Sequence, residues 1–255
     1  TELIQDKEVL NKYMSLLNSQ EEQKYKRLVF EKDKKRHLIA RALIRSTLSK
    51  YIDNIAPHEW QFTENKYGRP EISPSFISTD VRFNLSHSKN RVLLAITKAN
   101  DIGIDVEHLR KTNATEELAR YAFSELELRQ LKGVPVEGFY CQFFDFWTLK
   151  EAYIKACGMG LSIPLNSFSF HISEASEVSI SFSTSRADEP SKWKFWQLMR
   201  DDDYAISFGL KSDIDASSYA ITVRECIPLI RESLISPLLK LKPDSTNSLS
   251  SIERL

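Results

Sequence analysis

Hydrophobic residues recur at helical spacing in three stretches of the chain. In residues 21–50 the apolar side chains return at intervals of three, four and five, and similar patterns fill residues 115–131 and 139–158. One face of an α-helix is apolar at such intervals, so the pattern predicts three helices. After Glu225 a stretch rich in Leu and Ile runs into a polar end, where we expect a short helix followed by a mobile tail.

Short apolar runs in the rest of the chain predict strands. Alternation of apolar and polar residues is typical of a half-buried strand, and a short continuous apolar run is typical of a buried one. The predicted strands cover residues 60–63, 81–85, 91–97, 101–107, 161–165, 167–172, 178–182, 193–198, 204–208 and 219–223. Helices and strands therefore occur together in both parts of the chain, which predicts an α+β fold, although no repeated sequence is evident.

The composition is that of a globular protein with balanced charge. Of the 255 residues, 42% are hydrophobic and 27% charged, and 35 basic side chains face 35 acidic ones. These values exclude disordered and collagen-like classes and argue against a dedicated nucleic-acid-binding or membrane-binding protein. The sequence has neither the apolar core of a signal peptide nor a run of about 18 apolar residues. Cys141, Cys157 and Cys226 lie too far apart for a zinc or disulfide pattern, so we expect a cytoplasmic protein.

The segment 21–50 departs from this neutral balance. It contains ten basic residues against four acidic ones, a local excess of six positive charges. A solvated helix face explains such a run of charge. The alternative is a binding surface for a polyanion, because lysine and arginine form strong charge-assisted hydrogen bonds with phosphate groups.

Two carboxylates follow one another at alternate positions of the strand predicted at 101–107. They are Asp105 and Glu107, within the sequence GIDVE. Because successive side chains of a strand point to opposite faces, these two carboxylates share one face. Such a pair can hold a hard divalent cation such as Mg²⁺. The alternative is a strand with one solvated face and no metal.

The helix predicted at 139–158 carries a polar stripe on one face. Trp147, Glu151 and Lys155 are spaced four residues apart, which places them above one another on a helix. A surface ion pair explains the glutamate and the lysine. However, the aromatic residues around the stripe indicate a mostly buried helix, where charged groups need partners or a ligand.

Ser86, His87 and Ser88 follow the strand predicted at 81–85 and offer several hydrogen-bonding groups in one turn. The alternative is a histidine that caps a helix or sits in the core with its hydrogen bonds satisfied. The G-x-S-x-G sequence of serine hydrolases is absent, as are the P-loop and dinucleotide-binding glycine patterns.

Taken together, in order and spacing, four motifs resemble those of the surfactin-synthetase-type 4′-phosphopantetheinyl transferases. The motifs are YGRP at 67–70, FNLSHS at 83–88, GIDVE at 103–107 and FWTLKEAYIKACGMGL at 146–161. The resemblance covers residues 14–210. It implies two similar α+β halves related by a pseudo-two-fold axis, residues 1–105 and 106–225, with the active site between them. Residues 226–255 have no counterpart in the family and form a C-terminal extension, partly mobile.

The resemblance also implies an activity and a set of site residues. Members of the family transfer the 4′-phosphopantetheine group of coenzyme A to a serine of an apo-carrier protein, release adenosine 3′,5′-bisphosphate, and require Mg²⁺ or Mn²⁺. The implied metal ligands are Asp105, Glu107 and Glu151. The implied catalytic residues are Glu151, as base as well as ligand or as ligand alone, and Lys155. The implied contacts to the phosphates of coenzyme A are Lys24, Arg36, Arg69, Ser86 and His87.

Two other functional classes share parts of this pattern. A non-catalytic carrier-binding or nucleotide-binding module would have lost an acidic ligand or the lysine, and none is lost. A metal-dependent phosphohydrolase also uses paired carboxylates, but it releases phosphate without a carrier protein. The acceptor stays open among the carriers of fatty acid, polyketide, polyunsaturated fatty acid and non-ribosomal peptide synthesis.

Further expectations concern the partners of the enzyme. Two-half members of the family act as monomers, so we expect a monomer that binds neither nucleic acid nor membrane. The family docks its carrier protein near the segment that follows GIDVE. There, the expected contact residues are Tyr121, Phe123, Leu126, Leu128 and Leu131, and the alternative is that these side chains are ordinary core.

Overall fold

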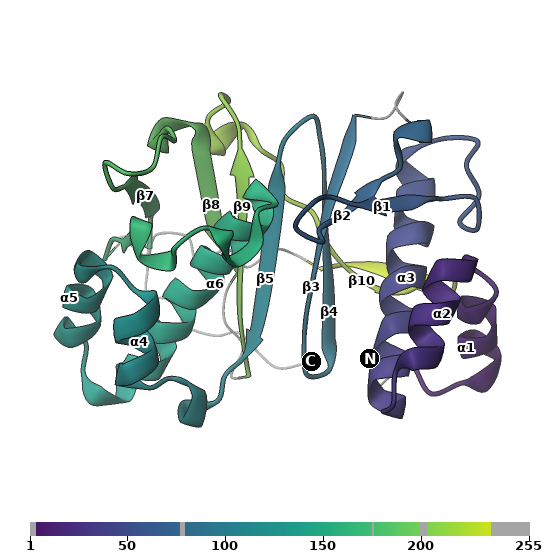
Figure 1. The fold of residues 1–255 in the computed structure, drawn as a ribbon, viewed down its shortest axis with the longest axis horizontal. Helices are drawn as coiled ribbons and strands as arrows, with labels where there is room; N and C mark the ends of the chain where they lie inside the picture. Colours follow the sequence, from purple (N-terminus) through teal and green to yellow (C-terminus); the bar gives the residue numbers. More distant parts are fainter. Residues whose placement is uncertain (1–3, 77–79, 175, 199–202, 236–255) are drawn as a thin grey trace, which may run out of the picture.

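Two sets of helices and strands follow one another along the chain and lie side by side (Figure 1). The structure, a computed structural model, describes residues 4–76, 80–174, 176–198 and 203–235. The first set comprises α1 (Lys7–Met14), α2 (Ser19–Arg27), α3 (Glu31–Tyr51), β1 (Phe62–Glu64), β2 (Pro70–Ile72), β3 (Val81–Ser88) and β4 (Arg91–Lys98). The second comprises β5 (Ile102–His108), α4 (Glu116–Ala122), α5 (Glu125–Gly133), α6 (Phe139–Cys157), β6 (Phe168–Ile172), β7 (Val178–Phe182), β8 (Trp193–Gln197) and β9 (Tyr204–Lys211).

The two sets repeat one order of elements: two short helices, one long helix and two antiparallel hairpins. We call α1 to β4 the first half and β5 to β9 the second half. The predicted α+β fold with two similar halves is confirmed. The boundary expected between residues 105 and 106 falls inside β5, the strand that opens the second half.

The helix predicted at 21–50 is divided into α2 and α3. Leu28 and Phe30 have extended backbone (φ −70°, ψ 130° and φ −90°, ψ 134°), which ends one helix and begins the next. Val29 and Phe30 are 81% and 63% exposed. β-Branched and aromatic residues have lower helix propensity than alanine or leucine, and burial does not compensate for it at these exposed positions.

The helix predicted at 115–131 is also two helices, α4 and α5. Phe123 ends α4 with extended backbone, and Ser124 begins α5 with a reciprocal capping box. Ser124 Oγ accepts a hydrogen bond from the Glu127 backbone N–H, and Glu127 Oε2 accepts one from the Ser124 backbone N–H. By contrast, the helix predicted at 139–158 is confirmed as α6, which ends where Gly158 adopts a left-handed φ of 66°.

Most predicted strands are present, but two are wrong. The segment 161–165 lies between the 3-10 turns Gly160–Ser162 and Leu165–Ser167, and Pro164 lacks the N–H that a strand would need there. The segment 219–223 reaches a strand only at its last residue, because the preceding residues form a 3-10 turn at Ala216–Ser218 and its exit.

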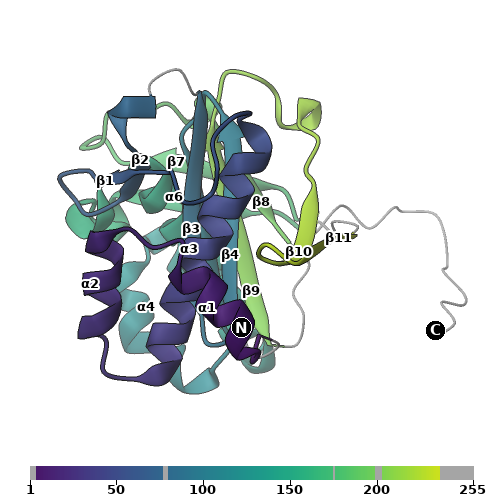
Figure 2. The ribbon, with the colours of Figure 1, turned by 90° about the vertical axis from the view of Figure 1, so that its right-hand side faces the viewer.

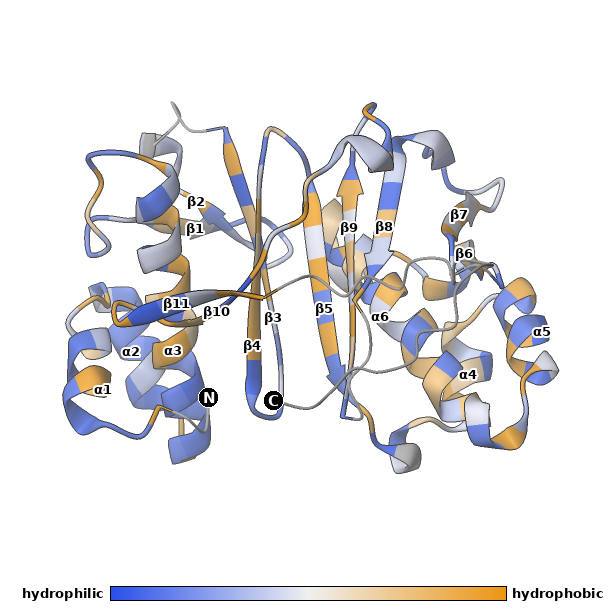
Figure 3. Ribbon diagram, turned by 180° about the vertical axis from the view of Figure 1, so that it is seen from behind, coloured by the Kyte–Doolittle hydropathy of each residue, from blue (hydrophilic) through white to orange (hydrophobic). Residues whose placement is uncertain are grey.

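The helix expected after Glu225 is absent from the described residues of this segment, which form a hairpin of β10 (Val223–Ile227) and β11 (Arg231–Ile235). Pro228 in the turn cannot continue the ladder, and Leu229 has a positive φ of 63°. Figures 2 and 3 show the hairpin lying along the first half, near α3. Tyr13 of α1 donates a hydrogen bond to the Pro228 carbonyl at 2.9 Å. The expected mobile tail lies outside the described residues.

Strand β5 lies at the centre of the molecule (Figure 1). On one side it pairs with β9 in the three-stranded antiparallel sheet β5-β9-β8. On the other side β5 contacts β3. Here side chains of β3, and not its backbone carbonyl groups, accept hydrogen bonds from the backbone of β5. Asn84 Oδ1, Ser86 Oγ and Ser88 Oγ accept hydrogen bonds from the backbone N–H groups of residues 104, 106 and 108. The residue numbers rise together, so the two strands are parallel. We call this contact the β3–β5 seam.

Helix α6 lies directly against β5, and Gly103 is the reason that it can. A Cβ at this position would lie 2.0 Å from the Ala152 carbonyl oxygen and 2.5 Å from the Ala156 nitrogen. The rest of α6 packs in the main core with large buried side chains such as Phe146 and Tyr153. In the described parts of the chain, no helix combines the length and apolarity that a membrane span requires.

Candidate active site

Charged side chains of β5 and α6 meet at the centre of the molecule. Because α6 lies against β5 at Gly103, Lys155 of the helix reaches Asp105 of the strand. Lys155 Nζ donates hydrogen bonds to Asp105 Oδ1 at 2.5 Å and to Ser86 Oγ at 2.9 Å. Ser86 Oγ donates in turn to the same carboxylate oxygen at 2.9 Å. Three elements, β3, β5 and α6, therefore converge on Asp105.

The charge of Asp105 acts on two neighbouring carboxylates, Glu107 and Glu151. Burial, and then the charge of Asp105, raises the pKa of Glu107 to about 7. The same two causes raise the pKa of Glu151, and in both cases Lys155 opposes the shift. Three carboxylates thus share a half-buried space with one lysine, so the cluster has an excess of negative charge that favours a cation.

The chemistry of these groups fits a hard divalent cation. Carboxylate oxygens are the ligands that Mg²⁺ prefers. Asp105 is 3% exposed, and its Oδ2 is buried with no hydrogen-bond partner among the described residues. However, over the described residues no three His, Cys, Asp or Glu side chains stand together in a way that could hold a metal ion. The donor types fit the metal, and the side-chain positions do not by themselves form a site.

Beside this cluster, His87 lies close to the positive charges of Arg36 and Lys155. Partial burial of the His87 ring lowers its pKa, and the positive charges of Arg36 and Lys155 lower it further. Arg36 is held by Asp33, with 2.7 Å between Nη2 and Oδ1. The structure thus brings together most of the predicted site residues, namely Arg36, Ser86, His87, Asp105, Glu107, Glu151 and Lys155.

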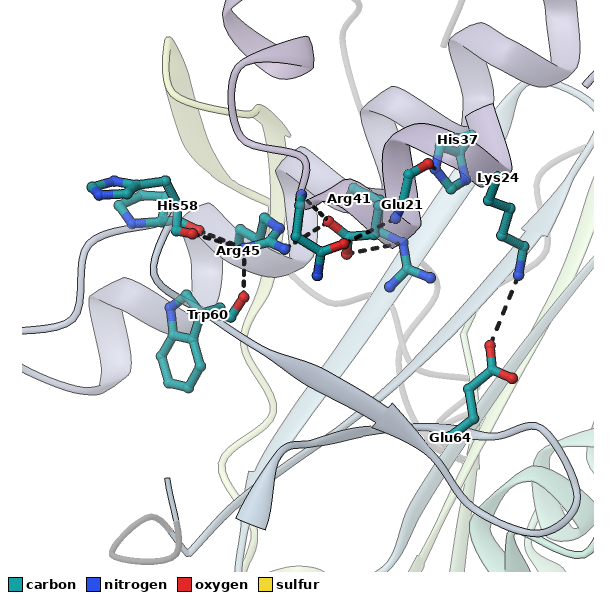
Figure 4. A network of polar contacts seen from close by, with 10 residues as sticks. Glu21, Lys24, His37, Arg41, Arg45, His58, Trp60 and Glu64 are labelled. Carbon is teal, nitrogen blue, oxygen red and sulfur yellow. Dashed lines mark hydrogen bonds and ion pairs between the residues drawn. The ribbon is translucent and has the colours of Figure 1, made fainter. Parts of the chain in front are cut away.

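Two predicted coenzyme A contacts have other neighbours. Lys24 is exposed on α2 and lies 3.9 Å from Glu64 of β1 (Figure 4). Arg69 donates hydrogen bonds to main-chain carbonyl groups, at 2.7 Å to Ala156 of α6 and at 3.2 Å to Ile102 of β5. The resemblance alone supports a role for both residues in binding coenzyme A, and this role stays a prediction.

Comparison with known proteins identifies the family. The model of the 4′-phosphopantetheinyl transferase superfamily matches residues 101–209, and that of the N-terminal part of 4′-phosphopantetheinyl transferases matches residues 5–99. The 4′-phosphopantetheinyl transferase HetI of Nostoc sp. is 32% identical over 206 residues, which cover 78% of this chain and 81% of that protein. The chain belongs to the 4′-phosphopantetheinyl transferase superfamily.

Other relatives of the transferase include 4′-phosphopantetheinyl transferase Sfp of Bacillus subtilis. It is 32% identical over 169 residues, which cover 66% of this chain and 72% of that protein. The crystal structure of a holo-(acyl-carrier-protein) synthase from Bacillus anthracis, in complex with CoA (3′,5′-ADP), aligns with 44% of this chain and 96% of its own. Its sequence identity is 19% and its TM-score 0.37.

The family assignment confirms the predicted activity. The protein is a transferase that moves 4′-phosphopantetheine from coenzyme A to apo-carrier proteins. Coenzyme A is therefore its substrate and a carrier protein its partner, as the motifs predicted.

The structure of the transferase also shows two contributors that the sequence does not single out, Asn84 and Gly103. Asn84 Oδ1 accepts the first hydrogen bond of the β3–β5 seam, and Gly103 allows α6 to approach. Ser88, expected in a turn after residue 85, belongs to β3 instead, and its Oγ donates a hydrogen bond to Glu107 Oε2 at 3.1 Å. The sequence carries a signal for Asn84, because polar residues 84, 86 and 88 alternate and share one face when the strand predicted at 81–85 continues to residue 88.

Proposed function

We propose that the transfer takes place at the cluster of Asp105, Glu107, Glu151 and Lys155. The observation that supports this proposal is the meeting of three carboxylates and one lysine where β5 and α6 touch, with burial and the charge of Asp105 raising the pKa of both Glu107 and Glu151. Asp105, Glu107 and Glu151 would hold Mg²⁺, or Mn²⁺ in its place. The metal would neutralise the pyrophosphate of coenzyme A and the charge that develops on it.

Two side chains of α6 would take part in the chemical step itself. Glu151 lies beside Asp105 and would accept the proton of the carrier serine, so that the serine oxygen can attack the phosphorus atom. Lys155 would stabilise the charge on the leaving phosphate. The positive groups around the cluster, Arg36 and His87 with Ser86, and further out Lys24, would bind the phosphates of coenzyme A.

A mass measurement tests the reaction and its site together. With coenzyme A and Mg²⁺, an apo-carrier protein should gain one phosphopantetheine, and a chelator should stop this gain. Glu151→Gln should lower kcat by ~10²–10⁴-fold, because the base is lost, and should still bind coenzyme A. Glu137→Gln, a surface change just before α6, is the matched control. Full kcat in Glu151→Gln, or a carrier panel that gains no mass with the wild-type enzyme, contradicts the proposal.

The carrier protein would dock beside α4 and α5. Of the five residues expected there, Tyr121 and Leu126 are 79% and 50% exposed. Phe123 and Leu131 are each 2% exposed, and Leu128 packs against the same core, so these three serve the fold. Leu126→Glu should raise the KM for the carrier and leave that for coenzyme A unchanged, while an unaltered carrier KM would place docking elsewhere.

The proposal includes a monomer that acts in the cytoplasm and needs neither nucleic acid nor membrane. One chain supplies the whole cluster from its second half and the surrounding Arg36, Ser86 and His87 from its first half, so a second copy is not required. The three cysteines are free thiols, which suits a reducing compartment. Light scattering at working concentration tests the monomer.

A further inference from the structure

The turn between β1 and β2 reaches from the first half to the end of α6. Asn65 Nδ2 donates a hydrogen bond to the Gly158 carbonyl at 2.8 Å, and Arg69 Nη1 donates one to the Ala156 carbonyl at 2.7 Å. The contact is close: a Cβ at Gly158 would lie 3.1 Å from both Asn65 Nδ2 and Arg69 Cδ. Two side chains of one turn thus hold the last carbonyl groups of the helix that carries Lys155.

Asn65 also gives the turn its shape. Its Oδ1 accepts hydrogen bonds from the backbone N–H groups of Tyr67 at 2.9 Å and Arg69 at 3.0 Å. The backbone N–H of Asn65 donates to the Arg69 carbonyl at 3.0 Å, and Gly68 provides the positive φ of 83°. One amide side chain therefore fixes the turn with its oxygen and binds α6 with its nitrogen.

Arg69 is committed to main-chain groups of three elements. Besides Ala156, its guanidinium donates to the carbonyl groups of Ile102 in β5 and Phe83 in β3. Burial lowers its pKa, and its Nε is buried without a hydrogen-bond partner in the described ranges. A buried cation needs compensation, which the carboxylates of Asp101 and Glu71 and the carbonyl groups at the negative end of α6 supply. The side chain is thus directed at the helix end.

We propose that Asn65 and Arg69 are positioning residues, which together form a latch that fixes the last turn of α6 relative to β3 and β5. Lys155 directly precedes Ala156, and its Nζ must meet Ser86 of β3 and Asp105 of β5. The latch ties the helix to the same two strands. This inference rests on the proposed role of Lys155, and it gives Arg69 a different role from the phosphate contact that the resemblance implies.

Asn65→Ala and Arg69→Ala test the latch, with Lys66→Ala as the matched control in the same turn. The measurements are kcat with an apo-acyl carrier protein, the Kd of coenzyme A by calorimetry, and hydrogen exchange of amides 155–158. Both latch variants should lose roughly 10- to 100-fold in kcat, because small misplacements of catalytic groups are costly. The Kd of coenzyme A should change by less than about threefold, and exchange at the end of α6 should accelerate. Lys66→Ala should match wild type.

The opposite pattern overturns the latch. If Arg69→Ala weakens coenzyme A about tenfold or more while Asn65→Ala keeps its kcat and its exchange rates, Arg69 is a coenzyme A ligand. If the alanine variants do not fold, Arg69→Lys and Asn65→Ser replace them, and full kcat with unchanged exchange in both would again overturn the latch. Hydrogen exchange needs no carrier, so it still decides the latch if wild type modifies no carrier and the proposed function fails.

Discussion

Each half of the transferase holds a buried ion pair between a short helix and the long helix beside it. In the first half Glu21 closes the capping box of α2 with Asn18 and pairs with Arg45 of α3 at 2.6 Å (Figure 4). In the second half Glu127 closes the capping box of α5 and pairs with Lys150 of α6 at 2.9 Å. In both halves, therefore, one glutamate caps a short helix and forms an ion pair with the long helix.

The two pairs are both buried, and they differ in the number of cations that the glutamate faces. The Glu127 and Lys150 side chains are 0% and 1% exposed, and Lys150 also donates to the carbonyl groups of Leu165 and Phe168. In the first half, Glu21 is shared: Arg45 takes one oxygen, and Arg41, which is 14% exposed, lies 3.5 Å from the other. Two arginines for one carboxylate leave a surplus positive charge in the half that carries the basic segment.

The same structural device therefore occurs in two versions. The Glu127–Lys150 pair, which is sealed from solvent, fixes α6 at the residue before Glu151. The Glu21 pair, which two arginines share, fixes α2 against α3. Three predictions test this distinction.

Lys150→Met should have the largest effect on stability. The substitution leaves Glu127 buried without its cation, which should lower the free energy of unfolding by about 3–5 kcal/mol in urea denaturation. The control is Glu127→Gln combined with Lys150→Met, which removes both charges and should recover most of the loss. A loss below about 1 kcal/mol for Lys150→Met would show that the Glu127–Lys150 pair does not behave as a buried ion pair.

Arg45→Met should cost less, about 2–3 kcal/mol, because Arg41 remains near Glu21 and compensates part of its charge. Arg41→Met alone should cost at most about 1 kcal/mol, and the double variant should lose about 1 kcal/mol more than the sum of the two. Urea denaturation of the three variants measures this coupling. Strict additivity would mean that the two arginines do not share the carboxylate.

The capping residues should show the smallest effects, and these should be equal. Asn18→Ala and Ser124→Ala each remove one acceptor for a helix N–H group, at a cost of about 1 kcal/mol in thermal or urea unfolding. Equal costs would show that the halves differ in their cations alone. A difference above about 1 kcal/mol would show that the caps differ too.

The fold was most predictable where one hydrophobic pattern continued over many residues. Helix α6 and the strands around residues 81–107 follow from continuous periodicity. One of the two divided helices was also readable, because Ser124-Glu-Leu-Glu127 has the spacing of a capping box and interrupts the helix predicted at 115–131. Hydrophobic spacing outweighed this signal and led to a single predicted helix. The break at residues 28–30 has no such signal, because α3 begins after Phe30 without a side-chain cap.

The candidate site was predictable in part for a similar reason. Asp105, Glu107, Glu151 and Lys155 belong to two local motifs, each of which places its side chains on one face. The partners of Arg69 were not predictable, because it bonds to a carbonyl group 87 residues further along the chain. A main-chain acceptor has no signature in the amino-acid sequence, so only the three-dimensional arrangement reveals such contacts.

The β3–β5 seam has a consequence for how the two halves can change over generations. A backbone ladder offers the same donors and acceptors in every sequence, but the acceptors of the seam are the side chains of Asn84, Ser86 and Ser88. One nucleotide change can remove a rung between the halves and leave the β3–β4 hairpin paired. Single substitutions can therefore weaken the contact between the two halves one hydrogen bond at a time, while the fold stays the same.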